Sequence, residues 1–168
     1  MLHLIPAPLH RRLYRLAYWA RSLWWRTLRP TIHGCRVVAL DGQGRVLLIR
    51  QSYGPTHWLT PGGSVERGED PVATAVRELA EETGVVLGDV RKVAQLLERP
   101  MGAYNVVHVV VGHASGALRA DEREVDEARW FSLQDLPADI SPRSLRAWAS
   151  GSRLTAARAD RFSPARVS

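Results

Sequence analysis

Three glutamates, Glu78, Glu81 and Glu82, are the residues of this chain best placed to do chemistry. If the surrounding segment is helical, a turn of 100° per residue puts all three within an arc of about 100°. Neighbouring carboxylates repel one another, and a hard divalent cation with oxygen ligands would relieve that repulsion. A solvated acidic helix face would show the same spacing. The spacing alone therefore leaves a magnesium site and a solvated helix face both open.

A glycine-rich turn lies just upstream of the glutamates, in the segment "WLTPGG" at residues 58–63. Proline followed by two glycines favours a tight turn with a bare backbone, whose carbonyls or amides can closely approach a ligand. Phosphate chemistry needs such an approach together with a cation. The turn therefore favours the metal-site hypothesis over the plain acidic surface.

The helix that carries the glutamates is predicted over residues 71–83. Asp70 is a good N-cap, Pro71 suits the first turn, and Gly84 is a left-handed stop. An apolar stripe occupies the arc beside the carboxylates and would face the core: Val72, Ala75, Val76 and Leu79. The glutamates thus lie at the edge of the buried seam.

The elements around this helix read mainly as strands. Apolar runs at 35–40 and 45–51 flank "DGQG", which predicts a β-hairpin. Further strands are predicted at 90–98, 104–114 and 128–133, and a helix over 141–150 begins at Ser141 and Pro142. Strands on both sides of a central helix indicate an α/β protein with a mixed sheet covered by helices.

The two ends of the chain differ from this middle part. Residues 9–29 have the pattern of one amphipathic helix, with leucines on one face and arginines on the other. It would either pack on its own domain or contact a membrane surface or a partner. From Gly151 the sequence loses its apolar period, which predicts a flexible tail. The predicted organisation is an N-terminal helix at 1–30, a domain at 31–150 and a tail at 151–168.

Composition excludes several classes of protein. The six arginines of residues 1–30 account for the whole formal charge of +6, so the neutral remainder does not indicate specific nucleic-acid binding. Arginines interrupt every apolar run of that segment, which argues against a signal peptide or a membrane span. Cys35 is the single cysteine, so no internal disulfide can form, and a buried thiol in a cytoplasmic protein is expected.

The segment from Gly63 to Val85 resembles the signature of the Nudix hydrolases. Gly63, five residues, Glu69, seven residues and then "RELAEETGV" meet every specified position of that pattern. The flanks "HWLTPGG" and "EVDEARWFSLQDLP" are also similar to those of the family, so the likeness covers about residues 31–140. It implies the Nudix fold, an α/β/α sandwich with a mixed β-sheet. It also implies hydrolysis of a diphosphate linkage in a nucleoside diphosphate derivative, with Mg²⁺, or alternatively Mn²⁺, as cofactor.

The resemblance implies a role for each residue of the metal site. Glu81 and Glu82 would be primary metal ligands. Glu78 would bind metal or act as the base that deprotonates the attacking water. Gly62 or Gly63 would offer a backbone carbonyl to the metal site, and Gly62 is also expected to contact substrate.

Other residues would support this set. Arg77 would orient a glutamate, and Glu69 would brace the loop–helix–loop through a salt bridge. The family's further carboxylate comes from the loop before the Trp-containing strand, where Glu124 is the first choice and Glu127 and Glu122 are alternatives.

The sequence says less about the substrate. Trp58 and Arg50 are candidates to stack on a base or pair with a phosphate, as are Tyr53 and Tyr104, although each also fits an ordinary structural role. Pro100, sixteen residues after Gly84, resembles a marker of ADP-ribose-cleaving members. ADP-ribose-type compounds and nucleoside triphosphates are therefore the leading substrate classes.

Two classes of function compete. The first is a Nudix pyrophosphohydrolase. The second is a non-catalytic Nudix-fold module that binds a nucleotide for regulation. Such a module could also associate with a membrane surface. The intact glutamate and arginine set favours the enzyme, and the sequence leaves a homodimer open.

Overall fold

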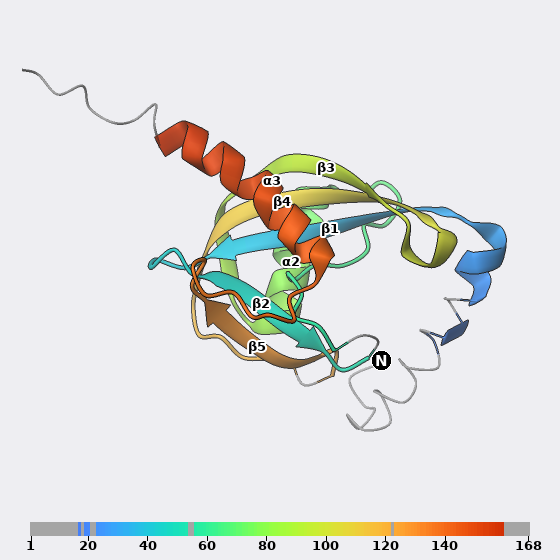
Figure 1. Cartoon of the computed structure of the whole chain (residues 1–168), viewed down its shortest axis with the longest axis horizontal. Helices are drawn as coiled ribbons and strands as arrows, with labels where there is room; N and C mark the ends of the chain where they lie inside the picture. The colour runs from blue at the N-terminus through green and yellow to red at the C-terminus, as the bar shows by residue number, and fades with distance from the viewer. Residues whose placement is uncertain (1–16, 18, 21–22, 54–55, 122, 160–168) are drawn as a thin grey trace, which may run out of the picture.

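The computed structural model describes residues 17, 19–20, 23–53, 56–121 and 123–159. Its regular elements form a sheet flanked by helices (Figure 1). In chain order they are β1 (Thr31–Leu40), β2 (Val46–Gln51), α2 (Pro71–Thr83), β3 (Val86–Glu98), the 3₁₀ helix η2 (Pro100–Gly102), β4 (Tyr104–Ser115), β5 (Val125–Phe131) and α3 (Pro142–Ala159).

The five strands form one mixed sheet in the order β3-β4-β1-β2-β5. β1 and β4 run parallel, with Cys35 opposite His108, whereas the other neighbours are antiparallel. The predicted hairpin is present: Leu40 pairs with Val46, and Gly44 closes the turn with φ 73°. The mixed sheet that the sequence predicted is therefore confirmed.

Alternate side chains of the same strands are buried on opposite faces of the sheet. On β1, Cys35, Val37 and Ala39 belong to the apolar cluster with Ala75 and Leu79 of α2. Their neighbours on the strand point to the opposite face, because successive strand side chains alternate. There Val38 packs in a second cluster that includes Ala147 of α3 and Trp58. The sheet thus lies between α3 in front and α2 behind (Figure 1), which is the predicted α/β/α sandwich.

Local chemistry accounts for the bounds of α2. The Asp70 side chain accepts a hydrogen bond from the Ala73 amide at 3.1 Å, and Gly84 ends the helix with φ 70°. Both ends were predicted because capping depends only on residues within one turn.

Other element bounds differ from the predicted ones. β3 begins at Val86, four residues early, because it pairs with β4 as far as Ser115. β5 covers Val125–Phe131 instead of 128–133, since its length follows its pairing with β2. α3 continues to Ala159, past the predicted end at 150. Alanine and arginine favour a helix without any apolar period, so the loss of that period did not mark its end. The part of the predicted tail at 160–168 lies outside the described residues.

Most of the predicted N-terminal amphipathic helix also lies outside the described residues, although residues 23–28 are helical. Among the described residues of this N-terminal segment, Trp19 and Leu23 are 71% and 69% exposed, while Trp25 is half-buried. Packing of the leucine face on the domain is therefore not seen at Leu23. None of the helices in the described residues is both long and apolar enough to span a membrane.

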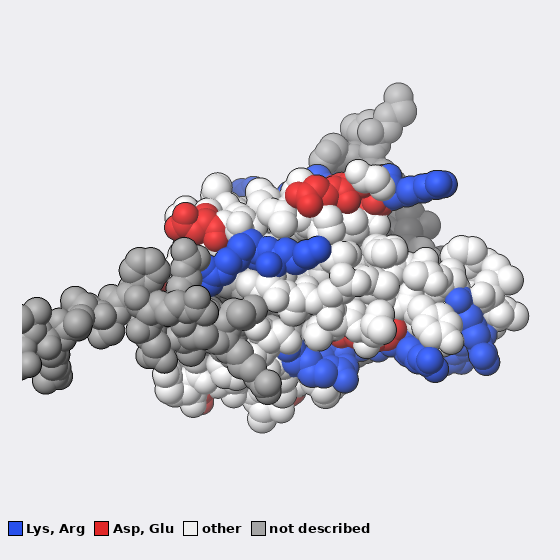
Figure 2. Space-filling view, turned by 90° about the horizontal axis from the view of Figure 1, so that it is seen from above, with Lys and Arg blue, Asp and Glu red and all other residues white. Residues whose placement is uncertain are grey.

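Charged side chains are sparse on the face drawn in Figure 2. There blue and red groups lie next to one another at several places on a mainly uncharged surface, as far as the described residues show. This face of the described chain carries no continuous basic strip of the kind that follows a nucleic-acid backbone.

Candidate active site

The Pro-Gly-Gly turn is held against the first half of β1 by backbone hydrogen bonds. The Cys35 amide donates to the Gly63 carbonyl at 2.9 Å, and the Val37 amide donates to the Pro61 carbonyl at 2.8 Å. Gly62 has φ 146°, and a β-carbon there would lie 2.2 Å from the Cys35 carbonyl oxygen. Only glycine can occupy this position without displacing the strand.

Two glutamates of α2 lie against this turn. The Gly62 amide donates a hydrogen bond to Glu82 Oε2 at 3.2 Å, and Glu82 is only 6% exposed. Glu78 lies beside Gly63, so closely that a β-carbon on Gly63 would be 2.3 Å from Glu78 Cδ. The helix and the bare backbone together place two carboxylates at one point of the fold.

The environment of Glu82 is unfavourable to its negative charge. Burial raises the pKa of Glu82 well above its usual value, and the charges of Glu78, Glu124 and Asp121 raise it further. The hydrogen bond from Gly62 opposes this shift. Burial likewise raises the pKa of Glu78, against the effect of Arg77. Neighbouring carboxylates whose pKa values are raised by burial and by one another are characteristic of a functional site.

Arg77 connects the carboxylates of the predicted signature. Its guanidinium contacts Glu78 at 3.0 Å, Glu81 at 3.1 Å and Glu69 at 3.3 Å. Burial alone would lower the pKa of Arg77, but the surrounding carboxylates raise it. Glu81 remains 62% exposed at its side chain. Arg77 therefore contacts two of the three helix glutamates.

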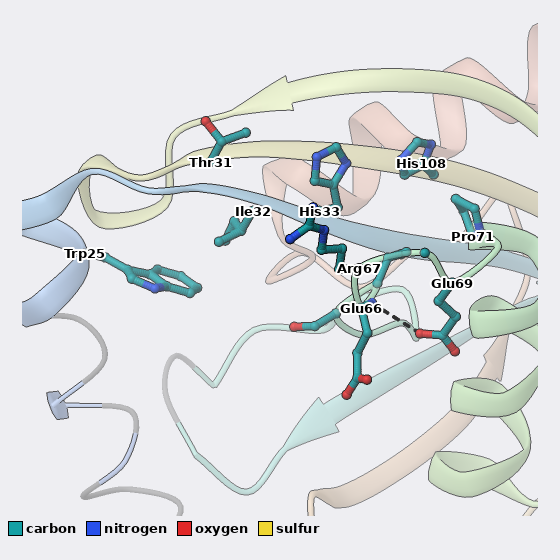
Figure 3. Close-up of a pocket in the computed structure, with 12 residues that line it drawn as sticks. Trp25, Thr31, Ile32, His33, Glu66, Arg67, Glu69, Pro71 and His108 are labelled. Atoms are coloured by element: carbon teal, nitrogen blue, oxygen red, sulfur yellow. Dashed lines mark hydrogen bonds between the residues drawn. The ribbon is translucent and has the colours of Figure 1, made fainter.

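Glu69 ties the loop before α2 to the helix. It accepts a hydrogen bond from the Glu66 amide at 3.2 Å, drawn as a dashed line in Figure 3, in addition to its contact with Arg77. Figure 3 also shows the pocket that this loop borders, with Trp25 at one end and the stacked rings of His33 and His108 above it. Glu69 thus makes the contacts that a brace of the loop requires.

Glu124 lies in the loop before β5. The charge of Glu124 raises the pKa values of both Glu78 and Glu82. The loop is shaped by Asp121, whose Oδ1 accepts hydrogen bonds from the amides of Arg123, Glu124 and Val125 at 3.1, 3.0 and 2.9 Å.

Asp121 was missed by sequence reasoning, although an aspartate a few residues before a strand is a signal for such a turn. The sequence also left Glu127 and Glu122 open as alternatives to Glu124. Glu127 pairs with Arg50 and Arg129, and Glu122 lies outside the described residues.

The donor set fits a divalent cation by its chemistry. Buried, mutually repelling carboxylates next to backbone carbonyls are the oxygen ligands that Mg²⁺ and Mn²⁺ take. Among the described residues, however, no three His, Cys, Asp or Glu side chains already surround a common point. Because Arg77 holds Glu78 and Glu81, these two carboxylates would have to turn from it to join Glu82 around a metal.

A pocket of about 550 Å³ opens beside Gly62 and Gly63, on the side of the sheet covered by α3. Tyr53 and Pro100 line it, whereas the predicted substrate contacts Trp58 and Arg50 do not. Trp58 is 4% exposed and packs edge-on against Phe131. Arg50 lies over the Trp58 ring and pairs with Asp139 at 2.7 Å.

Comparison with known proteins points to one family. A family model described as the NUDIX domain matches residues 32–149. The chain is 31% identical over 103 residues to the ADP-ribose pyrophosphatase of Bacillus subtilis (strain 168), covering 60% of this chain and 55% of the relative. It is 31% identical over 121 residues to the NAD-capped RNA hydrolase NudC of Vibrio atlanticus (strain LGP32), covering 70% and 44%.

A third relative is the human diphosphoinositol polyphosphate phosphohydrolase NUDT4B, 31% identical over 104 residues, with 60% of this chain and 57% of the relative covered. The chain thus spans about half the length of the curated relatives it matches.

Solved structures agree on the fold. The crystal structure of a MutT NUDIX hydrolase from Burkholderia pseudomallei has a TM-score of 0.64 at 27% identity, covering 71% of this chain and 97% of that one. The NUDIX domain of Shewanella oneidensis NrtR, solved with ADP ribose, has a TM-score of 0.66 at 20% identity, covering 81% and 97%.

Proposed function

Because the chain belongs to the NUDIX domain family, we propose that it is a hydrolase that cleaves the diphosphate linkage of a nucleoside diphosphate derivative with the help of Mg²⁺ or Mn²⁺. The observation that carries this proposal is the buried carboxylate of Glu82. It lies against the Gly62 amide and within electrostatic reach of Glu78 and Glu124. A binding module without turnover has no need of so unfavourable a cluster.

The proposed metal ligands are the side chains of this cluster. Glu82, Glu81, Glu78 and Glu124 would hold the cation, together with the carbonyl of Gly63. That carbonyl accepts one hydrogen bond, from Cys35, and retains a second lone pair. When bound, the cation would supply positive charge to the diphosphate oxygens and lower the pKa of the attacking water.

The chain's own residues then divide the remaining work. Glu78 accepts the proton of the attacking water, a role suited to a carboxylate with a raised pKa. Arg77 positions Glu78, and the Gly62 amide fixes the carboxylate of Glu82. Glu69 keeps the loop in place by joining Glu66 to Arg77.

The relatives and the pocket together support one substrate class. Relatives named for hydrolysis of ADP-ribose and of NAD-capped RNA support a nucleoside diphosphate linked to a second group. The pocket beside Gly62 supports the same class, because it adjoins the proposed diphosphate position and Tyr53 and Pro100 line it. We therefore propose ADP-ribose-type compounds as the first substrates to test, with nucleoside triphosphates next.

Assays of these compounds with Mg²⁺ test the proposal. We expect turnover by the wild type and at least a hundredfold lower kcat in Glu82→Gln, with an unchanged circular dichroism spectrum. Glu66→Gln is the matched control, because Glu66 is an exposed glutamate of the same segment whose backbone makes its contact with Glu69. Tight nucleotide binding without turnover of any compound would instead favour the regulatory module.

A membrane-surface role for the N-terminal segment stays a separate proposal. The exposure of Trp19 and Leu23 supports it, because large apolar side chains beside arginines suit an anionic lipid surface. We expect the full chain to sediment with vesicles of anionic lipid and a Trp19→Ser, Leu23→Ser variant to sediment less. Equal sedimentation of the two would contradict this role.

A further inference from the structure

The pocket beside Gly62 and Gly63 is lined by cations and by no carboxylate. Arg36, Arg143 and Arg146 line it, together with His33 and His57, whereas none of its described lining residues is Asp or Glu. The proposed diphosphate position lies at Gly62 and Gly63. The arginines form a separate, positively charged region of the same pocket.

Among the described residues, Glu98 is the one carboxylate that forms an ion pair with these arginines. Glu98, whose side chain is 2% exposed, pairs with Arg36 at 2.9 Å and lies 3.6 Å from Arg143. Glu98 is the more buried partner of this pair, and the side chain of Arg36 is 14% exposed. The pair of Glu98 and Arg36 is therefore internally neutral. The charges of Arg143 and Arg146 remain without an equal number of carboxylates.

The three guanidinium groups act on one another. Burial lowers the pKa of Arg36, Glu98 opposes this, and the charges of Arg143 and Arg146 lower the pKa further. Such mutual repulsion is relieved when an anion binds between cations. In addition, the Arg36 Nε is buried without a hydrogen-bond partner among the described residues. Two buried acceptors, Glu98 Oε1 and Asn105 Oδ1, likewise have no partner among the described residues, so it is the excess positive charge that favours an anion here.

Elements far apart in the sequence bring these groups together. Arg36 lies between Cys35 and Val37 on β1, and strand alternation turns it toward α3 instead of α2. Arg143 and Arg146 are three residues apart near the start of α3, so they share one side of that helix. The first turn of α3 also carries the positive end of the helix dipole.

The chemistry of the region points to a phosphate group. After Glu98 has offset Arg36, two arginine charges remain, and a phosphomonoester carries about −1.5 to −2 at neutral pH. Guanidinium groups bind phosphate oxygens through paired, charge-assisted hydrogen bonds. A neutral sugar or base would leave the two arginine charges uncompensated.

We infer that this pocket selects substrates that carry an additional phosphomonoester, away from the scissile diphosphate, and that Arg143 and Arg146 bind it. The inference rests on the proposed function for the position of the diphosphate. It narrows the substrate class to diphosphate derivatives in which the nucleoside or the linked group is itself phosphorylated. Glu98 contacts Arg143 as well as Arg36, and so helps to hold Arg143 beside the pocket.

Matched compounds that differ by one phosphate test this inference. The pairs are NADH and NADPH, dephospho-coenzyme A and coenzyme A, and ADP-ribose and its 2′-phosphate, each assayed with Mg²⁺ at one low ionic strength. In at least one pair we expect the phosphorylated member to have a kcat/KM at least tenfold higher. In an Arg143→Gln, Arg146→Gln variant we expect that ratio to fall to within about twofold of one.

Lys92→Gln is the control, because Lys92 is an exposed cation of β3 that does not line the pocket. Its ratio should equal that of the wild type, which would show that loss of a positive charge elsewhere on the surface does not change the ratio. Ratios near one for all three pairs in the wild type would overturn the inference. So would a preference that survives the double substitution.

Binding without turnover separates this inference from the proposed function. Calorimetric titration of each pair in EDTA should show the same preference for the phosphorylated member, and its loss in the arginine variant. Hydrolysis of none of the compounds, together with this binding preference, would overturn the proposed function and keep the pocket's specificity. Hydrolysis without any binding preference would overturn the specificity and keep the function.

Discussion

The backbone of Gly63 lies directly against the carboxylate of Glu78, so that a β-carbon on Gly63 would stand 2.3 Å from Glu78 Cδ. The atom in the way is the end of a flexible side chain, which can turn aside at little cost to the fold. We therefore expect Gly63→Ala to displace Glu78 and lower kcat at least tenfold, while the free energy of unfolding changes by less than about 1 kcal/mol. Steady-state kinetics and urea unfolding measure the two effects.

Gly42→Ala is the matched control for this substitution, because a β-carbon on Gly42 would meet nothing within 4 Å. It should leave kcat unchanged. A wild-type kcat in Gly63→Ala would mean that turnover does not depend on the position of Glu78.

The neighbouring glycine should behave differently. Gly62 has φ 146°, and its added β-carbon would meet the backbone of Cys35 instead of a movable side chain. A conformation of this kind costs a residue other than glycine about 1–3 kcal/mol. We expect Gly62→Ala to lower the free energy of unfolding by at least about 2 kcal/mol, measured by urea unfolding. A fully stable Gly62→Ala protein would mean that the turn can move away from β1.

The buried charge of Glu82 should make the metal-free protein less stable as the pH rises. The folded-state pKa of Glu82 is raised, so the folded state holds this proton at pH values where the unfolded chain has lost it. Stability is then greatest below the unfolded pKa of about 4.5, and it falls as the pH rises toward the folded pKa. In EDTA at pH 7 to 8 we expect Glu82→Gln to melt at a higher temperature than the wild type, with the difference shrinking near pH 4.

Mg²⁺ should reduce this difference at pH 7 to 8 by stabilising the wild type. A Glu82→Gln variant that melts below the wild type in EDTA at every pH would show that the charge of Glu82 is compensated inside the protein.

Asp121 should affect activity through the loop that presents Glu124. Its Oδ1 accepts three backbone hydrogen bonds, and asparagine can accept the same bonds without the charge. We expect Asp121→Ala to lower kcat at least fivefold and Asp121→Asn to retain at least half of it. Equal losses in the two variants would indicate that the charge of Asp121, and not the turn, matters.

Cys35 should be chemically inert in the folded protein. It is buried beneath the Gly63 turn, and burial raises the pKa of its thiol to about 11. Because the thiolate is the reactive form, we expect labelling by Ellman's reagent at pH 8 to be at least a hundredfold slower than in urea. Rapid labelling of the native protein would show that the turn opens away from β1.

The sequence by itself determined the parts of this protein that depend on near neighbours. The caps at Asp70 and Gly84 fixed α2, and the Asp-Gly-Gln-Gly turn at 41–44 fixed the hairpin between β1 and β2. The spacing of Glu78, Glu81 and Glu82 along one helix also follows from local geometry alone. These features identified the family and the mixed sheet before any contact between distant residues was known.

Only the tertiary structure decided how each of these side chains is surrounded. Glu81 and Glu82 are adjacent in sequence, yet one is exposed and the other is buried against Gly62. Burial of Trp58 beneath α3 likewise could not be read from its type.

The tertiary structure also decided which arginines line the pocket beside Gly62 and Gly63. Arg36 and Arg143 are brought together because β1 pairs in parallel with β4 and α3 packs across that face of the sheet. The reason is physical: capping and helix periodicity act within a few residues, whereas desolvation and electrostatic coupling depend on whatever the fold places nearby.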